Sequence, residues 1–362
     1  MVGMFNQDLF HRGSQKASLP GKLFHGLILM LLSLNLCWAQ QIGSSQNDSQ
    51  IRRPVGNVEN WASLSLAGSE LIPEEPLLGE RDDNPHFTRE LWQVKWRQGD
   101  PIDLYVIRPK GVAKPPVVLH LYSYPSETDI FRDDDYCADL TRDGLAAVGF
   151  VSALTGHRYI NRPMKEWFVS ELQEALGSSV HDVQMILNLL STRDDLDMNN
   201  VGMYGIGSGA TIAVLAAAAD PRIKAIDLVN PWGDWPEWMA KSDLIPEQER
   251  PRYLKPEFLK KVEPLDPVAW LPKLKTAHIH LQLVLDDAVT PMPAMDKIKA
   301  AAVTAQIVVF KTTPQFSQAG SSGKFLQWTK AQLQPGAVSQ PAAQGLLHSP
   351  ANQPVSELNH SD

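Results

Sequence analysis

Short apolar runs separated by polar turns occupy the middle of the chain and predict buried strands. Runs rich in Val, Ile and Leu are typical of strands buried on both faces of a parallel sheet. Six such runs lie at residues 116–122, 146–151, 201–204, 225–229, 279–284 and 306–310. Residues 91–96 and 102–107 alternate apolar and polar positions around a Gly-Asp-Pro turn, which predicts an antiparallel hairpin.

Segments with helical periodicity lie between these runs. Apolar residues recur at helical spacing from Ser178 to Leu190, and further helices are predicted at 210–219, at 293–302 and from Phe325. Strands that alternate with helices form βαβ units, so the fold class is α/β, a doubly wound and mostly parallel sheet. Residues 231–272 interrupt this rhythm and are rich in Trp and Pro, which predicts a small helical insertion over the carboxyl ends of the strands.

The beginning of the chain has the layout of a secretory signal peptide. Arg12, Lys16 and Lys22 precede the apolar run 27–36, and Ala39 supplies a small residue before a polar stretch. The run is shorter than the roughly 20 residues of a membrane-spanning helix, so an anchored segment is the less favoured alternative. The pattern predicts a secreted or periplasmic protein that is cleaved after Ala39 and has no stable membrane span afterwards.

These patterns predict four parts of the chain. They are a signal peptide (1–39), a polar leading segment (40–90), a main domain (91–332) and a tail (333–362). Prolines interrupt the leading segment, which predicts loose order with one short helix near Trp61. The tail is rich in Gln, Pro, Ala and Ser without hydrophobic periodicity, so it is predicted to be disordered.

Composition and charge exclude several classes of protein. The 362 residues are 43% hydrophobic and 20% charged, which fits a globular protein with a large core. A net charge of −8 gives no basic field for nucleic acid. Two cysteines exclude a disulfide scaffold. His278 and His280 share a strand face, but no third ligand lies at a fixed spacing, so no metal and no cofactor is predicted.

A glycine-rich turn follows the run at 201–204 and precedes the helix at 210–219. Residues 205–210 read Gly-Ile-Gly-Ser-Gly-Ala. A dinucleotide-binding loop needs G-x-G-x-x-G, and this spacing is out of register with that motif. A strand, a turn flanked by small residues and a helix instead indicate a nucleophile elbow, whose central residue projects from a sharp turn.

The chain resembles the α/β-hydrolase family in four places: this turn, the Ala-rich helix after it, residues 220–225 and residues 287–291. It is similar to the dienelactone-hydrolase-like and prolyl-oligopeptidase-like esterases over about residues 91–332. The resemblance implies a catalytic triad with Gly207 at the nucleophile position, Asp287 at the acid position and Gln315 at the base position. A shift of one residue would instead place Asp286 at the acid position.

Two of these three positions lack the required chemistry. Glycine has no side chain that could attack an acyl carbon. Glutamine cannot take a proton from a hydroxyl group near neutral pH. Ser208 is the alternative nucleophile, although that register turns its hydroxyl away from the exposed tip of the turn. The competing interpretation makes Ser208 a first-turn helix residue that helps to bind an anion.

Two further groups of residues border the same end of the sheet. Tyr122 and Ser123 follow a strand where the family has an oxyanion-hole amide, and Ser208 follows the elbow. Three tryptophans begin the insertion and are interpreted either as its core or as the lining of a cleft for apolar or sugar-like molecules. They are Trp232, Trp235 and Trp238.

These residues together predict a non-catalytic protein with a hydrolase fold that binds a small-molecule or ester-like ligand or acts as a scaffold. The alternative is a weak or unconventional carboxylic-ester hydrolase that uses Ser208, or a water molecule with Asp287. A surface module that binds a protein partner through its leading segment and tail is a third class, supported by composition alone. Fold does not fix function, so the resemblance supports the architecture more than an activity.

Overall fold

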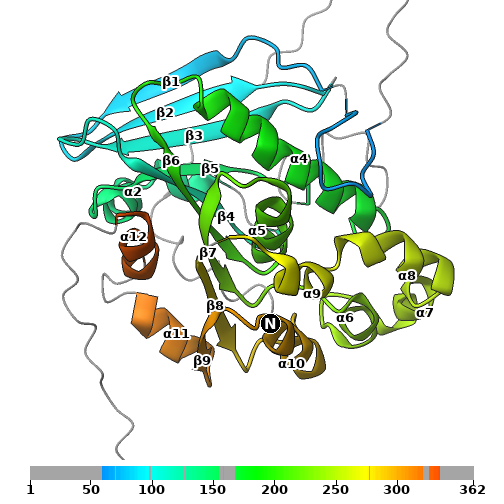
Figure 1. Ribbon diagram of the computed structural model, residues 1–362. Helices are drawn as coiled ribbons and strands as arrows, with labels where there is room; N and C mark the ends of the chain where they lie inside the picture. Colours follow the sequence, from blue (N-terminus) through cyan, green and yellow to red (C-terminus); the bar gives the residue numbers. More distant parts are fainter. Residues whose placement is uncertain are drawn as a thin grey trace, which may run out of the picture.

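The computed structural model describes residues 59–334 apart from Glu70, Gln98, 126–127, 155–157, 159–167, Ala277 and 321–325. Nine strands form one sheet in the order β1-β2-β3-β5-β4-β6-β7-β8-β9 (Figure 1). β1, β2 and β3 pair antiparallel, β3 also pairs antiparallel with β5, and all pairs from β5 to β9 are parallel. The strands are β1 (Leu77–Asp83), β2 (Phe87–Val94), β3 (Ile102–Pro109), β4 (Pro116–Leu121), β5 (Ala146–Phe150), β6 (Asp197–Ile206), β7 (Ile223–Val229), β8 (His278–Val284) and β9 (Gln306–Phe310).

Helices cover both faces of the sheet (Figure 1). They are α2 (Asp134–Thr141), α4 (Leu172–Leu190), α5 (Ser208–Ala219), α6 (Trp235–Lys241), α7 (Arg250–Tyr253), α8 (Pro256–Val262), α9 (Pro267–Trp270), α10 (Met292–Ala301), α11 (Thr313–Ala319) and α12 (Gln327–Leu333). Side chains alternate across β4, so Leu119 packs in the core with α4 and α5, and Val118 packs in the core with α2 and α12. The predicted doubly wound, mostly parallel sheet is confirmed.

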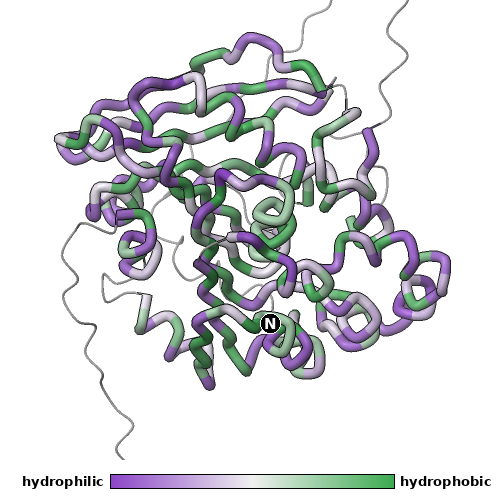
Figure 2. The backbone as a smooth tube through the Cα atoms, viewed as in Figure 1, coloured by the Kyte–Doolittle hydropathy of each residue, from purple (hydrophilic) through white to green (hydrophobic). Residues whose placement is uncertain are grey.

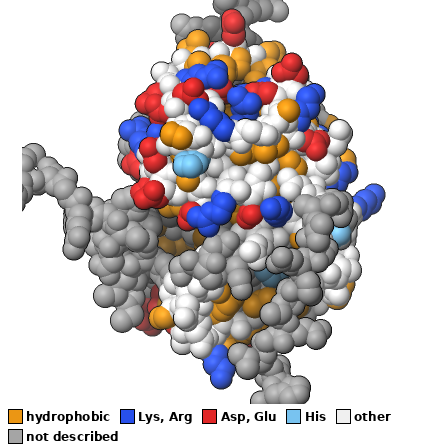
Figure 3. Space-filling view, turned by 90° about the vertical axis from the view of Figure 1, so that its left-hand side faces the viewer, with side chains coloured by type: hydrophobic (Ala, Val, Ile, Leu, Met, Phe, Trp, Pro, Cys, Tyr) orange, Lys and Arg blue, Asp and Glu red, His pale blue; other side chains and the backbone are white. Residues whose placement is uncertain are grey.

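Hydrophobic residues are concentrated along the central strands, and polar residues along β1 and the outer helices (Figure 2). All six residues of β4 and all five of β5 are buried, as expected for strands covered on both faces. On the face shown in Figure 3, basic and acidic side chains are interspersed. Among the residues described, no helix is long and apolar enough to cross a membrane.

The Trp- and Pro-rich insertion is helical, as predicted. It contains α6 to α9 and three short 3₁₀ turns, η2 (Glu247–Glu249), η3 (Glu263–Leu265) and η4 (Leu271–Lys273). Each of these helices except η2 has a proline in its first turn. Proline fixes φ near the helical value and lacks only an N–H that is unpaired there anyway, so repeated prolines start short helices.

The leading segment differs from its prediction. Residues 77–83 form an edge strand of the same sheet, so the sheet begins before the predicted domain boundary at 91. Trp61 lies in a turn rather than in a helix. We call residues 59–69 the N-terminal strap, because they bind along α4: the Gln184 side chain donates to Leu64 O and accepts from Leu66 N. These partners are far apart in sequence, so local periodicity could not indicate them.

A buried ion network joins the strap to α4 and to the loops after β2 and β5. Arg97 makes two 2.6 Å hydrogen bonds to Glu59 and also bonds Asp182. Arg158 binds Asp100 through two nitrogens and Asp182 through a third contact of 2.6 Å. Burial alone would raise the pKa of Glu59, but hydrogen bonds with Arg97 and with the buried His181 lower it to about 2. The network therefore holds paired charges inside the fold.

The predicted signal peptide and nearly all of the predicted tail lie outside the described residues. The prediction for residues 1–39, cleavage after Ala39 included, therefore stays a prediction, as does the disorder of the tail.

Candidate functional site

The glycine-rich turn joins the carboxyl end of β6 to α5. Gly207 occupies the tip of the turn with φ 54° and ψ −117°, a conformation that favours glycine. A Cβ atom on Gly205 would lie 2.5 Å from Gly209 O, and a Cβ atom on Gly209 would lie 2.2 Å from Leu121 O. The backbones approach closely at both flanking positions, so position 207 is the one that projects from the turn.

The space in front of Gly207 is occupied by the side chain of a residue in the loop after β4. A Cβ atom at position 207 would lie 2.3 Å from Ser123 Oγ and 3.0 Å from Trp232 Nε1. Ser123 follows β4, the neighbour of β6 in the sheet. The hydroxyl of Ser123 therefore stands where a side chain on the elbow residue would begin.

The hydroxyl of Ser208 points elsewhere. Ser208 is the first residue of α5, is completely buried, and its Oγ accepts a hydrogen bond of 3.0 Å from Tyr124 N. Tyr122, the third residue predicted beside the elbow, shares a hydrogen bond between its hydroxyl and that of Tyr136 on α2. The Tyr122 side chain packs in the core with α2, so it does not face Ser208.

Asp287 lies in the turn after β8 and is held by nitrogen donors. Its Oδ1 accepts from Val289 N at 3.0 Å, and its Oδ2 accepts from Asn230 Nδ2 at 3.0 Å and from Thr290 N at 3.3 Å. Burial raises the pKa of Asp287, and the hydrogen bonds oppose this rise. Asn230 also exchanges hydrogen bonds with the backbone of Val284, so it ties the end of β7 to this turn.

Gln315 lies on α11, where the resemblance implies a base. Its Oε1 accepts a 2.9 Å hydrogen bond from Lys311 N, and its side chain is exposed. Asp286 accepts from both N and Oγ1 of Thr313 at the start of α11. Among the described residues no hydrogen bond joins Gln315 to Asp287. The expectation that Gln315 lies beside Asp287 lacks support, because Gln315 caps the amino end of its own helix.

The three tryptophans form the core of the insertion. Trp232, Trp235 and Trp238 are 2%, 1% and 0% exposed. The rings of Trp232 and Trp238 stack at 5.0 Å, and Trp235 meets Trp238 edge to face at 5.8 Å. The interpretation of these residues as the lining of an open cleft is therefore wrong for Trp235 and Trp238, whereas Trp232 places its Nε1 atom 3.0 Å from the position of a Cβ atom on Gly207. Apolar burial and ring stacking favour the core position.

His280 pairs with Asp227 on the face of the sheet next to α12. His280 Nδ1 lies 2.9 Å from Asp227 Oδ1, and the His280 ring stacks on Trp328 at 5.0 Å. His278, at the start of the same strand, is exposed. No group of three or more His, Cys, Asp or Glu residues is placed to hold a metal ion within the part of the chain that the structure describes.

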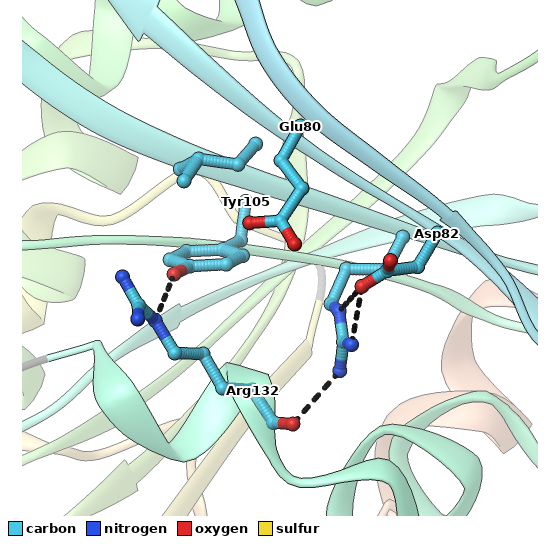
Figure 4. A pocket seen from close by; sticks show the side chains of 6 residues that line it. Glu80, Asp82, Tyr105 and Arg132 are labelled. Atoms are coloured by element: carbon cyan, nitrogen blue, oxygen red, sulfur yellow. Dashed lines mark hydrogen bonds and ion pairs between the residues drawn. The ribbon is translucent and has the colours of Figure 1, made fainter.

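A small pocket lies away from the elbow, between β1, β2, β3 and the 3₁₀ turn η1 (Asp129–Arg132) (Figure 4). Four of its polar side chains are already engaged: Arg132 Nε donates to Tyr105 Oη at 3.0 Å, and Arg89 binds Asp82 and the backbone oxygen of Arg132. The pocket is therefore a polar recess of the hairpin, and the elbow is the better candidate site.

Comparison with known proteins agrees with this geometry. Residues 98–255 match the family model of the X-Pro dipeptidyl-peptidases (S15 family). Acetyl xylan esterase 1 from Thermoanaerobacterium sp. JW/SL YS485 superposes with a TM-score of 0.55 at 16% identity, covering 73% of this chain and 88% of that one. The acetyl xylan esterase from Paenibacillus sp. R4 gives 0.57 at 16% identity, covering 73% and 89%. This chain has the α/β-hydrolase fold.

A third structure with this fold is the acylaminoacyl peptidase of Pyrococcus horikoshii. It has a TM-score of 0.54 at 15% identity, and the match covers 71% of this chain and 44% of that one. No curated protein matches the sequence. At these identities the similarity defines the fold, so any activity has to be argued from the residues at the elbow.

Two features of the α/β-hydrolase elbow could not be read from the sequence. The position of Ser123 Oγ in front of Gly207 depends on the contact between β4 and β6. The support of Asp287 by Asn230 joins residues from two different strand ends. Asn230 has φ 42°, and asparagine directly before a proline after a strand is the only local signal of a special turn there.

Proposed function

We propose that this protein is a non-catalytic member of the α/β-hydrolase-fold proteins that binds a small ligand at the elbow. The observation that supports this most directly is the position of Gly207 at the tip of the turn, between β6 and α5. In a serine hydrolase the residue at this tip provides the attacking hydroxyl. Gly207 provides no attacking atom, so no acyl-enzyme can form there.

The surroundings of Gly207 support the same proposal. Gln315 is an amide, and its oxygen accepts a hydrogen bond from Lys311 N, so it is not available as a general base. Asp287 remains held by three nitrogen donors, as an orienting acid would be. An acid without a base or a nucleophile cannot complete the proton transfers of acyl transfer.

The alternative enzyme would use Ser208. Its Oγ is buried and accepts the hydrogen bond of Tyr124 N, which orients the oxygen toward the loop after β4. This contact favours a structural role, in which Ser208 fixes that loop against the start of α5. A water molecule activated by Asp287 is the other route of the alternative enzyme, and the assay below covers both.

The purified protein is expected to hydrolyse p-nitrophenyl acetate no faster than its Ser208→Ala and Asp287→Asn variants. The reason is that neither residue would be part of a working triad. Initial rates at pH 7 and pH 9, with buffer and with heat-denatured protein as blanks, measure this. Turnover by the wild type that disappears in Ser208→Ala or in Asp287→Asn would contradict the proposed function.

We also propose that the protein is exported, on the basis of the positive, apolar and small-residue pattern of residues 1–39. Expression of the full chain in a bacterial host is expected to give a product whose first residue is Gln40. Mass spectrometry of the product from the periplasm or medium measures this. A product in the cytoplasm that keeps residues 1–39 would contradict export.

A further inference from the structure

Two hydrogen-bond donors converge beside Gly207, and neither has a partner within the part of the chain that the structure describes. Trp232 is 2% exposed, and its Nε1 lies 3.0 Å from the position of a Cβ atom on Gly207. Ser123 Oγ lies 2.3 Å from the same position and belongs to a half-buried residue. Among the residues described, neither atom makes a hydrogen bond. Trp232 Nε1 is not among the completely buried unpaired atoms of the described residues, which include Nε1 of Trp235 and Trp238, so an acceptor can reach it and form a favourable hydrogen bond.

The same corner is the amino end of α5. This helix has 12 residues, and its N-cap residue, Gly207, provides no side-chain hydrogen bond. The first amides of a helix have no acceptor within the helix, and the helix dipole makes this end positive. A negatively charged group is therefore favoured here, and the indole N–H of Trp232 and the hydroxyl of Ser123 add two side-chain donors to that preference.

The surroundings indicate an organic anion rather than a bare ion. The Phe168 ring stacks on Trp232 at 6.1 Å and lies 4.4 Å from the Tyr124 ring. Phe168 is fully buried, but Tyr124 is only half-buried, so an apolar chain attached to the anion would meet the Tyr124 ring. The carboxylate of Asp287 already accepts from Asn230, Val289 and Thr290, so it does not need Trp232 or Ser123 as donors.

We propose that the elbow is a binding site for a small carboxylate with an apolar chain, held by the Trp232 indole N–H, the Ser123 hydroxyl and the amino end of α5. The inference rests on the proposed function, because Gly207 provides no nucleophile and the donors of Ser123 and Trp232 lie beside it instead. A carboxylate is the product of ester or amide hydrolysis. The site would therefore bind a carboxylate like the one that a hydrolase releases, although it does not catalyse the hydrolysis.

Hexanoate is the probe, and the indole N–H resonances of ¹⁵N-Trp-labelled full-length protein are the readout. The Trp232 resonance, assigned through Trp232→Phe, is expected to shift saturably with hexanoate and less with acetate. Ser123→Ala is expected to weaken hexanoate binding about tenfold or more, as for a lost hydrogen bond to a charged group. Trp328→Phe is the matched control, because Trp328 Nε1 donates to Gln306 at 2.9 Å, away from the elbow.

Three results would overturn the inference. They are no shift of the Trp232 resonance with hexanoate, equal shifts with chloride or phosphate, and unchanged hexanoate affinity in both Trp232→Phe and Ser123→Ala. The ester assay separates this failure from that of the proposed function. Ester turnover would reject the non-catalytic proposal, whereas the hexanoate titration rejects or supports the carboxylate site whatever the assay gives.

Discussion

Gly207→Ala is expected to lower the free energy of unfolding by about 2–6 kcal/mol. Two costs add up. A side chain at φ 54° and ψ −117° adopts a sparsely populated backbone conformation, which costs about 1–3 kcal/mol. The new Cβ atom would also stand 2.3 Å from Ser123 Oγ, and crowding of this kind costs about 1–3 kcal/mol. Urea unfolding followed by far-ultraviolet circular dichroism measures the loss.

Two variants separate these costs. Gly111 has φ 81° with nothing within 4 Å of an added Cβ atom, so Gly111→Ala reports backbone conformation alone, about 1 kcal/mol. Ser123→Gly removes the crowding, so its combination with Gly207→Ala is expected to recover about 1–3 kcal/mol in a double-mutant cycle. A loss in Gly207→Ala no larger than in Gly111→Ala, with no coupling to Ser123, would contradict the account of the elbow.

Asp182→Asn is expected to lower the free energy of unfolding by about 3–5 kcal/mol, because it leaves two buried guanidinium groups without their shared carboxylate. Asp182 is fully buried and accepts from Arg97, from Arg158 and from Trp96 Nε1 at 2.8 Å. Asparagine keeps the shape of the side chain and removes its charge. Urea unfolding at pH 7 measures the difference between the two proteins.

The pH dependence of this difference has a definite sign. Burial alone would raise the pKa of Asp182, but the charges of Arg158 and Arg97 lower it well below the ordinary value of 3.8. A lowered pKa in the folded state stabilises the protein above pH 3.8, and this stabilisation disappears as the pH falls further. The free energies of unfolding of the wild type and of Asp182→Asn are thus expected to become equal in acid.

The matched control is Asp139→Asn, which removes one charge of the exposed ion pair with Arg142. Its free energy of unfolding is expected to fall by at most about 1 kcal/mol. An equal loss in both variants would contradict the role of the network.

The strands could be predicted wherever the apolar pattern is strong. β4 and β5 lie where runs of Val, Leu and Ala predict them, because both faces of these strands are buried. β9 also lies at its predicted residues, although it is an edge strand without a buried residue. β1 could not be predicted, because an edge strand with exposed residues such as Glu80 and Asp82 has no apolar period. Its place depends on pairing with β2, a contact between segments that no local pattern records.

The elbow could be predicted only in part from the sequence. Spacing of the glycines predicts which residue stands at the tip, because only close backbone contacts require glycine at both flanks. The directions of side chains that meet there depend on tertiary contacts. The resemblance to the α/β-hydrolase family implies a base at Gln315, yet α11 begins soon after β9 and the Gln315 amide oxygen accepts from Lys311 N. The position of Ser123 Oγ depends on the packing of β4 against β6.

The most direct test of the central claim is intact-mass spectrometry of the purified protein after incubation with a fluorophosphonate, which bonds covalently to an activated serine. Two matched variants, Ser208→Ala and Ser123→Ala, identify any labelling at the two serines beside the tip of the turn. No mass increase is expected for the wild type under conditions that label a known serine esterase to completion. A single stoichiometric adduct on the wild type that is lost in Ser208→Ala or in Ser123→Ala would contradict the non-catalytic proposal.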